Sequence, residues 1–243
     1  MNRFDDADDP RRRILIAALG LGLIGSSLTP GVARGASVFG DRPSRLPPNQ
    51  SIYRLSGNAQ VNGQPASLET RIKPGDTVQT GKDSELVFVV GNQALMMRSE
   101  SQLKLDQGQS STIVSGLRLL TGKLLSVFGR SNPVRINTVT ATIGIRGTGV
   151  YLEANPEETY FCTCYGITDV ESASDPTSRD TIAATHHDRP VYIVKDGGAG
   201  QKIRRAPFIN HTDQELMLIE SLVGRTPPFV FPGDQYSGPR REY

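Results

Sequence analysis

Tryptophan is absent from this 243-residue chain, and aromatic residues make up only 6% of it. Sites that stack nucleic-acid bases depend on aromatic side chains, and sugar-binding grooves are commonly lined by them, so the composition argues against both. The net charge is only +2, and lysine and arginine form no long block. Nucleic-acid binding needs a concentrated basic face, so nucleic acid is not an expected partner.

Recognisable catalytic motifs are also missing. No serine lies in a GxSxG elbow, and no pair of carboxylates stands out for acid–base work. The glycine-rich segment 197–200 is not followed by the lysine and hydroxyl residue of a phosphate-binding loop, and no helix begins there. The sequence therefore predicts a protein that is not an enzyme.

The N-terminus has the pattern of an export signal. Three arginines at 11–13 precede an apolar run from Ile14 to Ile24, which is shorter than the roughly 20 residues of a membrane span. Small residues follow, so cleavage is expected after Ala33 or after Gly35. The arginines resemble a twin-arginine signal, so either the Sec or the twin-arginine route to the periplasm is expected. The alternative is an uncleaved anchor; in both cases the rest of the chain faces an oxidising compartment.

Short alternating apolar and polar segments run from Ile52 to about Val194, separated by turn residues every eight to twelve positions. This period-two pattern predicts an all-β fold: a roll, an irregular solenoid or a sandwich. One helix is expected near the C-terminus, with Thr212 as N-cap, Glu215 completing a capping box, and Gly224 ending it. A proline-rich, extended tail follows.

Three segments of the β region resemble the FecR domain, a periplasmic β module. They read GNAQVNG at 57–63, IKPGDTVQTGKDS at 72–84 and IRGTGV at 145–150. The resemblance implies a roll resembling a β-solenoid over 52–152, and its best-known members carry signals from outer-membrane receptors to a sigma factor. Only about a dozen residues precede the apolar run, so a stand-alone type without the anti-sigma segment is expected. The expected organisation is a signal peptide at 1–35, a linker at 36–51, the FecR-like domain at 52–152, a Cys/His-bearing β extension at 153–200, and the helix with its tail at 201–243.

The scarcest reactive side chains all lie in one stretch of about 50 residues. Both cysteines (Cys162, Cys164) and all three histidines (His186, His187, His211) are there. Thiolates and imidazoles are ligands that zinc and copper prefer. These five residues are therefore the candidate metal ligands, with zinc or copper as the candidate ion.

Residues 158–165 are expected to form a strand in which Tyr160, Cys162 and Cys164 share one face. Cysteines two apart on a regular strand are at the limit for an unstrained disulfide, which favours two thiolates on one ion. A bulge would instead permit a reducible bridge. Residues 181–187 are expected to form the neighbouring strand, with either His186 or His187 on the cysteine face. His211 is the candidate fourth ligand.

Three functions remain open from the sequence. The first is an exported, non-enzymatic FecR-like module that binds a ligand, a metal or an envelope partner in signalling or sensing. The second is a thiol–disulfide protein that uses Cys162 and Cys164 as a redox pair. The third is a structural envelope domain whose cysteines are small buried residues and which pairs with a partner through exposed strand edges.

Overall fold

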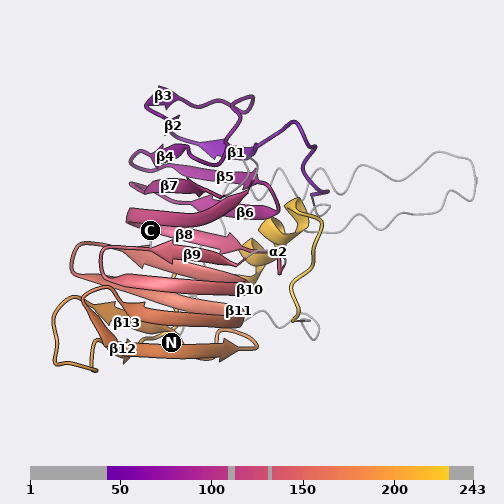
Figure 1. Ribbon diagram of the computed structural model, residues 1–243. Coiled ribbons are helices and arrows are strands. Elements are labelled where there is room, and N and C mark those ends of the chain that lie inside the picture. Colours follow the sequence, from indigo (N-terminus) through magenta and orange to yellow (C-terminus); the bar gives the residue numbers. More distant parts are fainter. Residues whose placement is uncertain (1–42, 109–112, 131–132, 230–243) are drawn as a thin grey trace, which may run out of the picture. The chain divides into compact units, whose positions relative to one another are not determined.

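The computed structural model describes residues 43–108, 113–130 and 133–229, all within one compact unit. These residues form fourteen strands and one helix (Figure 1). The elements are β1 (Ile52–Ser56), β2 (Ala59–Val61), β3 (Gln64–Pro65), β4 (Thr77–Thr80), β5 (Glu85–Val90), β6 (Gln93–Met97), β7 (Gln102–Gln107), β8 (Val114–Val127), β9 (Val134–Asn137), β10 (Ala141–Ala154), β11 (Glu158–Ser172), β12 (Asp175–Ala184), β13 (Val191–Val194), β14 (Ile203–Arg205) and α2 (Asp213–Leu222). The predicted all-β fold with one C-terminal helix is confirmed; the signal segment and the tail from residue 230 lie outside the described residues.

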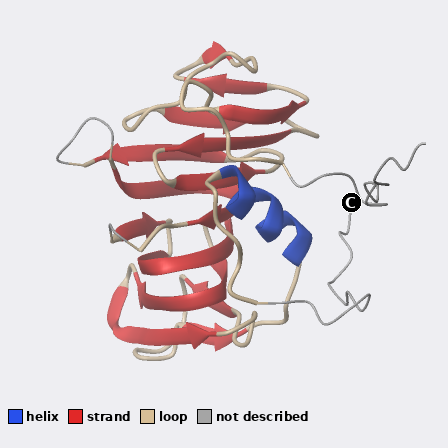
Figure 2. Ribbon diagram, turned by 90° about the vertical axis from the view of Figure 1, so that its right-hand side faces the viewer, coloured by secondary structure: helices blue, strands red, loops and turns tan. Residues whose placement is uncertain are grey.

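Three long strands, β8, β10 and β11, each take part in two layers. Their ends nearer α2 join β1, β5, β6, β13 and β14, and we call this set the helix-side layer. Their other ends pair with β7, β9 and β12, and β2, β3 and β4 extend this far layer. The strands of each layer stack one above another, with α2 beside the helix-side layer (Figure 2).

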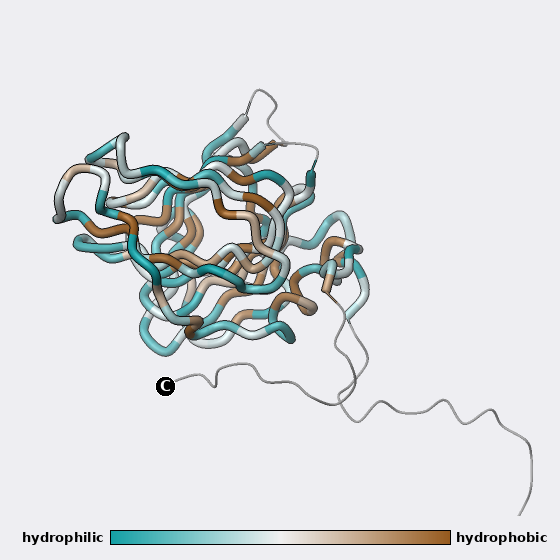
Figure 3. The backbone as a smooth tube through the Cα atoms, turned by 90° about the horizontal axis from the view of Figure 1, so that it is seen from below, coloured by the Kyte–Doolittle hydropathy of each residue, from teal (hydrophilic) through white to brown (hydrophobic). Residues whose placement is uncertain are grey.

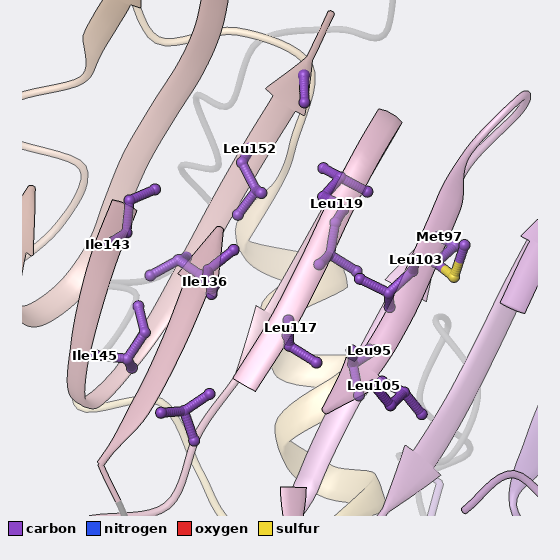
Figure 4. Close-up of a cluster of buried hydrophobic side chains, with 14 of the residues drawn as sticks. Leu95, Met97, Leu103, Leu105, Leu117, Leu119, Ile136, Ile143, Ile145 and Leu152 are labelled. Atoms are coloured by element: carbon purple, nitrogen blue, oxygen red, sulfur yellow. The ribbon is translucent and has the colours of Figure 1, made fainter. Parts of the chain in front are cut away.

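The main hydrophobic core lies between the two layers. The far layer contributes leucines and isoleucines from β7 to β10, and the helix-side layer contributes Leu95, Met97 and Leu152 (Figure 4). Seen from below, the chain winds around this interior (Figure 3). Alternate residues of each strand point inward, which is why the period-two pattern was visible in the sequence.

The helix-side layer is buried on its outer face as well. Val87, Met96, Leu125, Tyr151 and Cys162 alternate with the inward-facing residues and form a second cluster with the apolar face of α2. Burial on both faces explains the unbroken apolar runs of β5 and β6, because neither face needs polar residues. The C-terminal helix is therefore required to cover this face.

Glycines with positive φ lie where the long strands pass from one layer to the other. Gly166 on β11 has φ +93°, and a Cβ there would lie 2.5 Å from Cγ2 of Thr148 and 3.1 Å from the carbonyl oxygen of Gly147. Gly147, with φ +67°, belongs to the arginine-glycine-threonine segment that resembles the FecR pattern. These corners therefore need glycine both for backbone conformation and for space.

The helix begins and ends as the sequence predicts. Thr212 accepts a hydrogen bond from the backbone of Glu215, and the Glu215 carboxylate accepts one from the backbone of Thr212. At the other end, the backbone N–H of Leu46 donates to the carbonyl of Leu222 at 3.0 Å, so the irregular segment 43–51 packs against the end of the helix. In the described part of the chain, no helix is both long and apolar enough to cross a membrane.

Replacing Gly166 by alanine tests the corner. The positive φ alone should cost about 1–2 kcal/mol, and the contact with Thr148 and Gly147 should add about 1–3 kcal/mol of overpacking. Gly200 is the matched control, because its φ is +73° but a Cβ there meets nothing within 4 Å. Urea unfolding should show G166A clearly less stable than G200A; equal losses would mean that the close approach at the corner is unimportant.

Candidate metal centre

Both cysteines lie on the same side of β11, and a bulge interrupts the strand at Cys164. Gly149 pairs with Tyr165 and Val150 pairs with Thr163, which leaves Cys164 without a partner opposite it on β10. Cys162 and Cys164 both lie in the cluster beneath α2, so the prediction of a shared face is confirmed. In a regular strand Tyr165 would lie on the opposite face, but it lies on the same side as the cysteines because the extra residue of the bulge shifts the alternation.

The paired histidines lie in a bend rather than in a strand. Strands β11 and β12 form a hairpin that turns at 173–174. β12 ends at Ala184, so the strand expected over 181–187 stops before the histidines. The backbone N–H of His187 donates to the carbonyl of Cys164 at 2.9 Å, which ties the bend to the bulge. His187 has φ +52°, so the backbone leaves the strand here and the two imidazoles no longer alternate as strand residues would.

The start of α2 supplies the other side of the site. His211 precedes the N-cap Thr212 and is fully buried, and Asp213 is the first helical residue. The ring of His211 stacks on Tyr151 of β10, with centroids 4.4 Å apart, and meets the ring of Phe208 edge to face. This aromatic packing fixes the direction in which the imidazole points.

Four of the five predicted ligands come together: Cys162, Cys164, His187 and His211, all of them buried. Their donor atoms all lie within 4.8 Å of one another. Sγ of Cys162 is 3.4 Å from Nδ1 of His187, and that nitrogen is 3.1 Å from Nε2 of His211. Neighbouring donors around a tetrahedral zinc ion lie about 3.3–3.8 Å apart, given Zn–S and Zn–N bonds of about 2.3 and 2.0–2.1 Å.

The hydrogen bonds on the far side of each ring determine which nitrogens face this group. Nδ1 of His211 lies 2.7 Å from the carbonyl oxygen of Ile209, which can only accept, so this nitrogen carries the proton. Nε2 of His187 lies 2.9 Å from the Asp213 carboxylate and donates to it. In neutral rings, the two remaining nitrogens therefore both present lone pairs to the same point. Such a carboxylate–histidine or carbonyl–histidine contact is typical of metal ligands.

The electrostatics of the group favour one ionised thiol. Burial opposes ionisation of Cys162, but hydrogen bonds with Cys164, His187 and His211 outweigh it and hold its pKa well below the ordinary thiol value. Burial and the neighbouring Cys162 raise the pKa of Cys164. Burial opposes protonation of His187, but hydrogen bonds with Asp213 and Cys162 raise its pKa to about 9. Without a metal, the stable arrangement is a thiolate–imidazolium pair.

His186, the fifth predicted ligand, lies apart from the four. Its side chain is 47% exposed, and its Nε2 lies 2.9 Å from each oxygen of Asp213. Burial favours the protonated acid of Asp213, but hydrogen bonds from His187 and His186 outweigh it and lower the pKa. His186 therefore helps to keep this carboxylate ionised beside His187.

Asp213 is the functional residue that the sequence did not single out. It occupies the first turn of a helix, where acidic residues are common because they interact favourably with the helix dipole. Its partner His187 lies 26 positions earlier in the sequence, so no local pattern marked the contact. Recognising it required the position of the bend that carries His186 and His187.

Ion pairs and hydrogen bonds hold α2 against this face. Arg98 of the β6–β7 connection makes a two-pronged contact with Glu215 at 2.8 and 3.0 Å and also donates to the carbonyl of Asn210. At the other end of the helix, the hydroxyl of Tyr165 donates to Glu220, which also pairs with Arg225 at 2.7 Å. The positions of His211 and Asp213 are therefore fixed by contacts on both sides of them.

Comparison with known proteins identifies the class of domain. Residues 76–164 match the family model described as "FecR protein". The chain therefore contains a FecR domain, which confirms the resemblance seen in the sequence. The match starts and ends later than the expected range 52–152. It includes both cysteines but stops before His187, His211 and α2.

Solved structures show a weaker similarity. Two crystal structures of a "putative anti-sigma factor" from Parabacteroides distasonis ATCC 8503 align with 12% sequence identity and a TM-score of 0.44. Each alignment covers 66% of this chain and 82% of the other. Similarity at this level says nothing about partners or activity. No curated protein matches this sequence.

The metal-free protein should carry one thiolate at neutral pH. Its ultraviolet thiolate absorbance should persist on acidification well below the ordinary thiol pKa of about 8.5, because His187 stabilises the charged form of Cys162. In H187A the absorbance should be lost at a higher pH than in the unmodified chain, because the hydrogen bonds from Cys164 and His211 remain but that from His187 is gone. H186A is the matched control and should behave like the unmodified chain. Equal titrations of H187A and the unmodified protein would contradict the proposed pair.

Proposed function

We propose that this chain is an exported, non-enzymatic FecR-domain module of envelope signalling or sensing, with a zinc site formed by Cys162, Cys164, His187 and His211. The metal would fasten the C-terminal helix to the sheet. Three of these ligands come from β11 and the bend after β12, and the fourth precedes α2. One ion would thus join segments that lie about 50 residues apart in sequence.

The observation that carries the metal site is the pair of facing imidazole nitrogens. Nδ1 of His187 and Nε2 of His211 are 3.1 Å apart, and the outer hydrogen bonds of both rings leave lone pairs on these atoms. In neutral rings these two lone pairs repel each other. In the metal-free protein a proton on His187 relieves this repulsion, and a metal ion would take the place of that proton. Sγ of Cys162 lies 3.4 Å from Nδ1 of His187, so an ionised Cys162 adds a negative charge beside the two nitrogens. This charge further favours a metal ion.

The donor set favours a closed, structural zinc site. Two thiols and two imidazoles without an accessible open position are typical of zinc ions that hold folds together. Cys162, His187 and Asp213 also follow the order nucleophile, base and orienting acid that covalent catalysis uses. Cys162 is fully buried, however, and a nucleophile needs access to its substrate. The burial therefore supports a structural function over catalysis.

The signalling assignment is supported by the FecR domain itself. Export is supported by the arginines and the apolar run at the N-terminus. A partner in the envelope would be recognised by a folded surface rather than by a catalytic pocket. The zinc site would contribute by keeping that surface in one conformation.

Elemental analysis of the protein, expressed with its own leader and purified without chelator, tests the site. About one equivalent of zinc should be bound, and it should be lost in C162S and H211A because a tetrahedral site needs all four ligands. Stripping the metal should also lower the thermal unfolding temperature, since metal binding contributes to folding stability.

H186A is the matched control, because it removes a neighbouring imidazole that contacts Asp213 but lies outside the four-donor group. It should retain most of the zinc. Two results would contradict the proposal: a metal-free purified protein, or a loss in H186A as large as in H211A.

A second candidate function is a thiol–disulfide pair, and the bulge in β11 is the observation that favours it. Cys164 occupies the bulge and lies on the same side as Cys162, and both are free thiols. An ionised Cys162 beside a second thiol is the arrangement from which a disulfide forms. The two functions are compatible if oxidation is confined to the metal-free protein.

Oxidised glutathione tests this candidate. The metal-free protein should lose two hydrogen atoms in mass, as two thiols become one disulfide and the oxidant becomes two molecules of glutathione. The zinc-loaded protein should be unchanged, because both thiolates are bound. A persistent mixed disulfide with glutathione, or no reaction, would exclude an internal redox pair.

A further inference from the structure

A cleft lies at the end of α2 opposite the metal centre. It is formed by the 45–51 segment, the 71–74 loop, the end of β5 and the last turn of the helix, and we call it the cationic cleft. Its volume is about 650 Å³, within the range of roughly 300–1,000 Å³ that is typical of small-molecule sites. The metal site does not use it, and of its lining only residues 89–91 lie within the FecR match.

Three positive side chains line this cleft: Arg45, Arg71 and Lys73, all of them exposed. No carboxylate lines it, and within the described ranges none of these three residues forms an ion pair. Arg71 is held in place by a hydrogen bond from its Nη2 to Oδ1 of Asn49 at 2.8 Å. Unpaired like charges around one concavity raise the local concentration of anions.

The floor of the cleft is apolar. Ile72, Val90 and Leu222 are buried there, and Leu46 and Val223 are partly exposed beside them. Two prolines at 47–48 form part of the wall and offer no backbone N–H to a ligand. A simple inorganic anion would use the cations but leave this apolar surface unused.

We propose that the cationic cleft binds a single-chain amphipathic anion, such as a fatty-acid carboxylate. The head group lies among Arg45, Arg71 and Lys73, and the chain lies along the floor toward Leu222 and Val223. Guanidinium groups suit this ligand because they bind carboxylates with two hydrogen bonds. Burial of the chain against Leu46 and Val223 adds a non-directional contribution that scales with chain length.

The test is an NMR titration of the full-length protein, as purified and with its zinc content measured, with three probes that each isolate one property. Octanoate carries both the charge and the chain, acetate carries only the charge, and 1-octanol carries only the chain. Octanoate should bind roughly tenfold more tightly than either other probe. Acetate lacks the buried chain and 1-octanol lacks the charge-assisted contact, and each of these interactions strengthens binding by about a factor of ten. The amide signals of Ile72 and Val223 should shift with saturation.

The variants separate the cleft from general positive charge. R71A/K73A should weaken octanoate binding roughly tenfold, whereas K104A/R135A, which removes the same charge from exposed positions on β7 and β9, should change it less than about twofold. Arg45 is left intact because it also packs against Gly224 at the carbonyl end of α2.

Several outcomes would overturn the proposal. Equal binding of acetate and octanoate would show an adventitious ion only, and equal binding of 1-octanol would show an apolar groove without charge recognition. Shifts confined to other residues, or equal weakening in both double variants, would place the ligand elsewhere. Because zinc content is measured independently, none of these results depends on the function proposed for the metal centre.

Discussion

The requirement that the helix-side layer be buried on both faces determines where the C-terminal part of the chain must lie. Met96, Leu125 and Tyr151 point away from the main core and would be exposed without α2. Covering them removes apolar surface from water, which is the dominant favourable term in folding. The four donors of the candidate metal centre meet as a consequence of this packing, because the same face carries Cys162 and the covering segment carries His211. The site therefore lies at an interface that the core already requires.

The bends that let β11 serve two layers also shape the site. Gly166 turns the strand at the corner, and the bulge just before it brings Tyr165 to the side that carries Cys162 and Cys164. The carbonyl of Cys164 at the bulge accepts the backbone N–H of His187, which ties this histidine to the cysteines. Bulges are common next to functional sites because they redirect side chains without interrupting the sheet.

Much of the fold follows from local patterns, whereas the site depends on contacts between distant segments. Alternation predicted the strands, and the capping box at Thr212 and Glu215 predicted the helix to within a residue of its start. The face of Cys162 was predictable because strands alternate, but that of Tyr165 was not, since a bulge has no reliable signal in the side chains. Which of His186 and His187 faces the cysteines was not predictable, because it depends on the positive φ of His187 in the bend after β12. The function of Asp213 depended on how α2 docks, which is a tertiary property.

Helix α2 joins two features that the sequence alone does not connect. Its first residues lie at the metal centre, and its last residues, with Val223, form a wall of the cationic cleft. The helix is held by Arg98 at one end and by Tyr165 at the other, so a metal ion would be one of several attachments rather than the only one. Loss of the ion would then loosen the start of the helix while its apolar face remained packed.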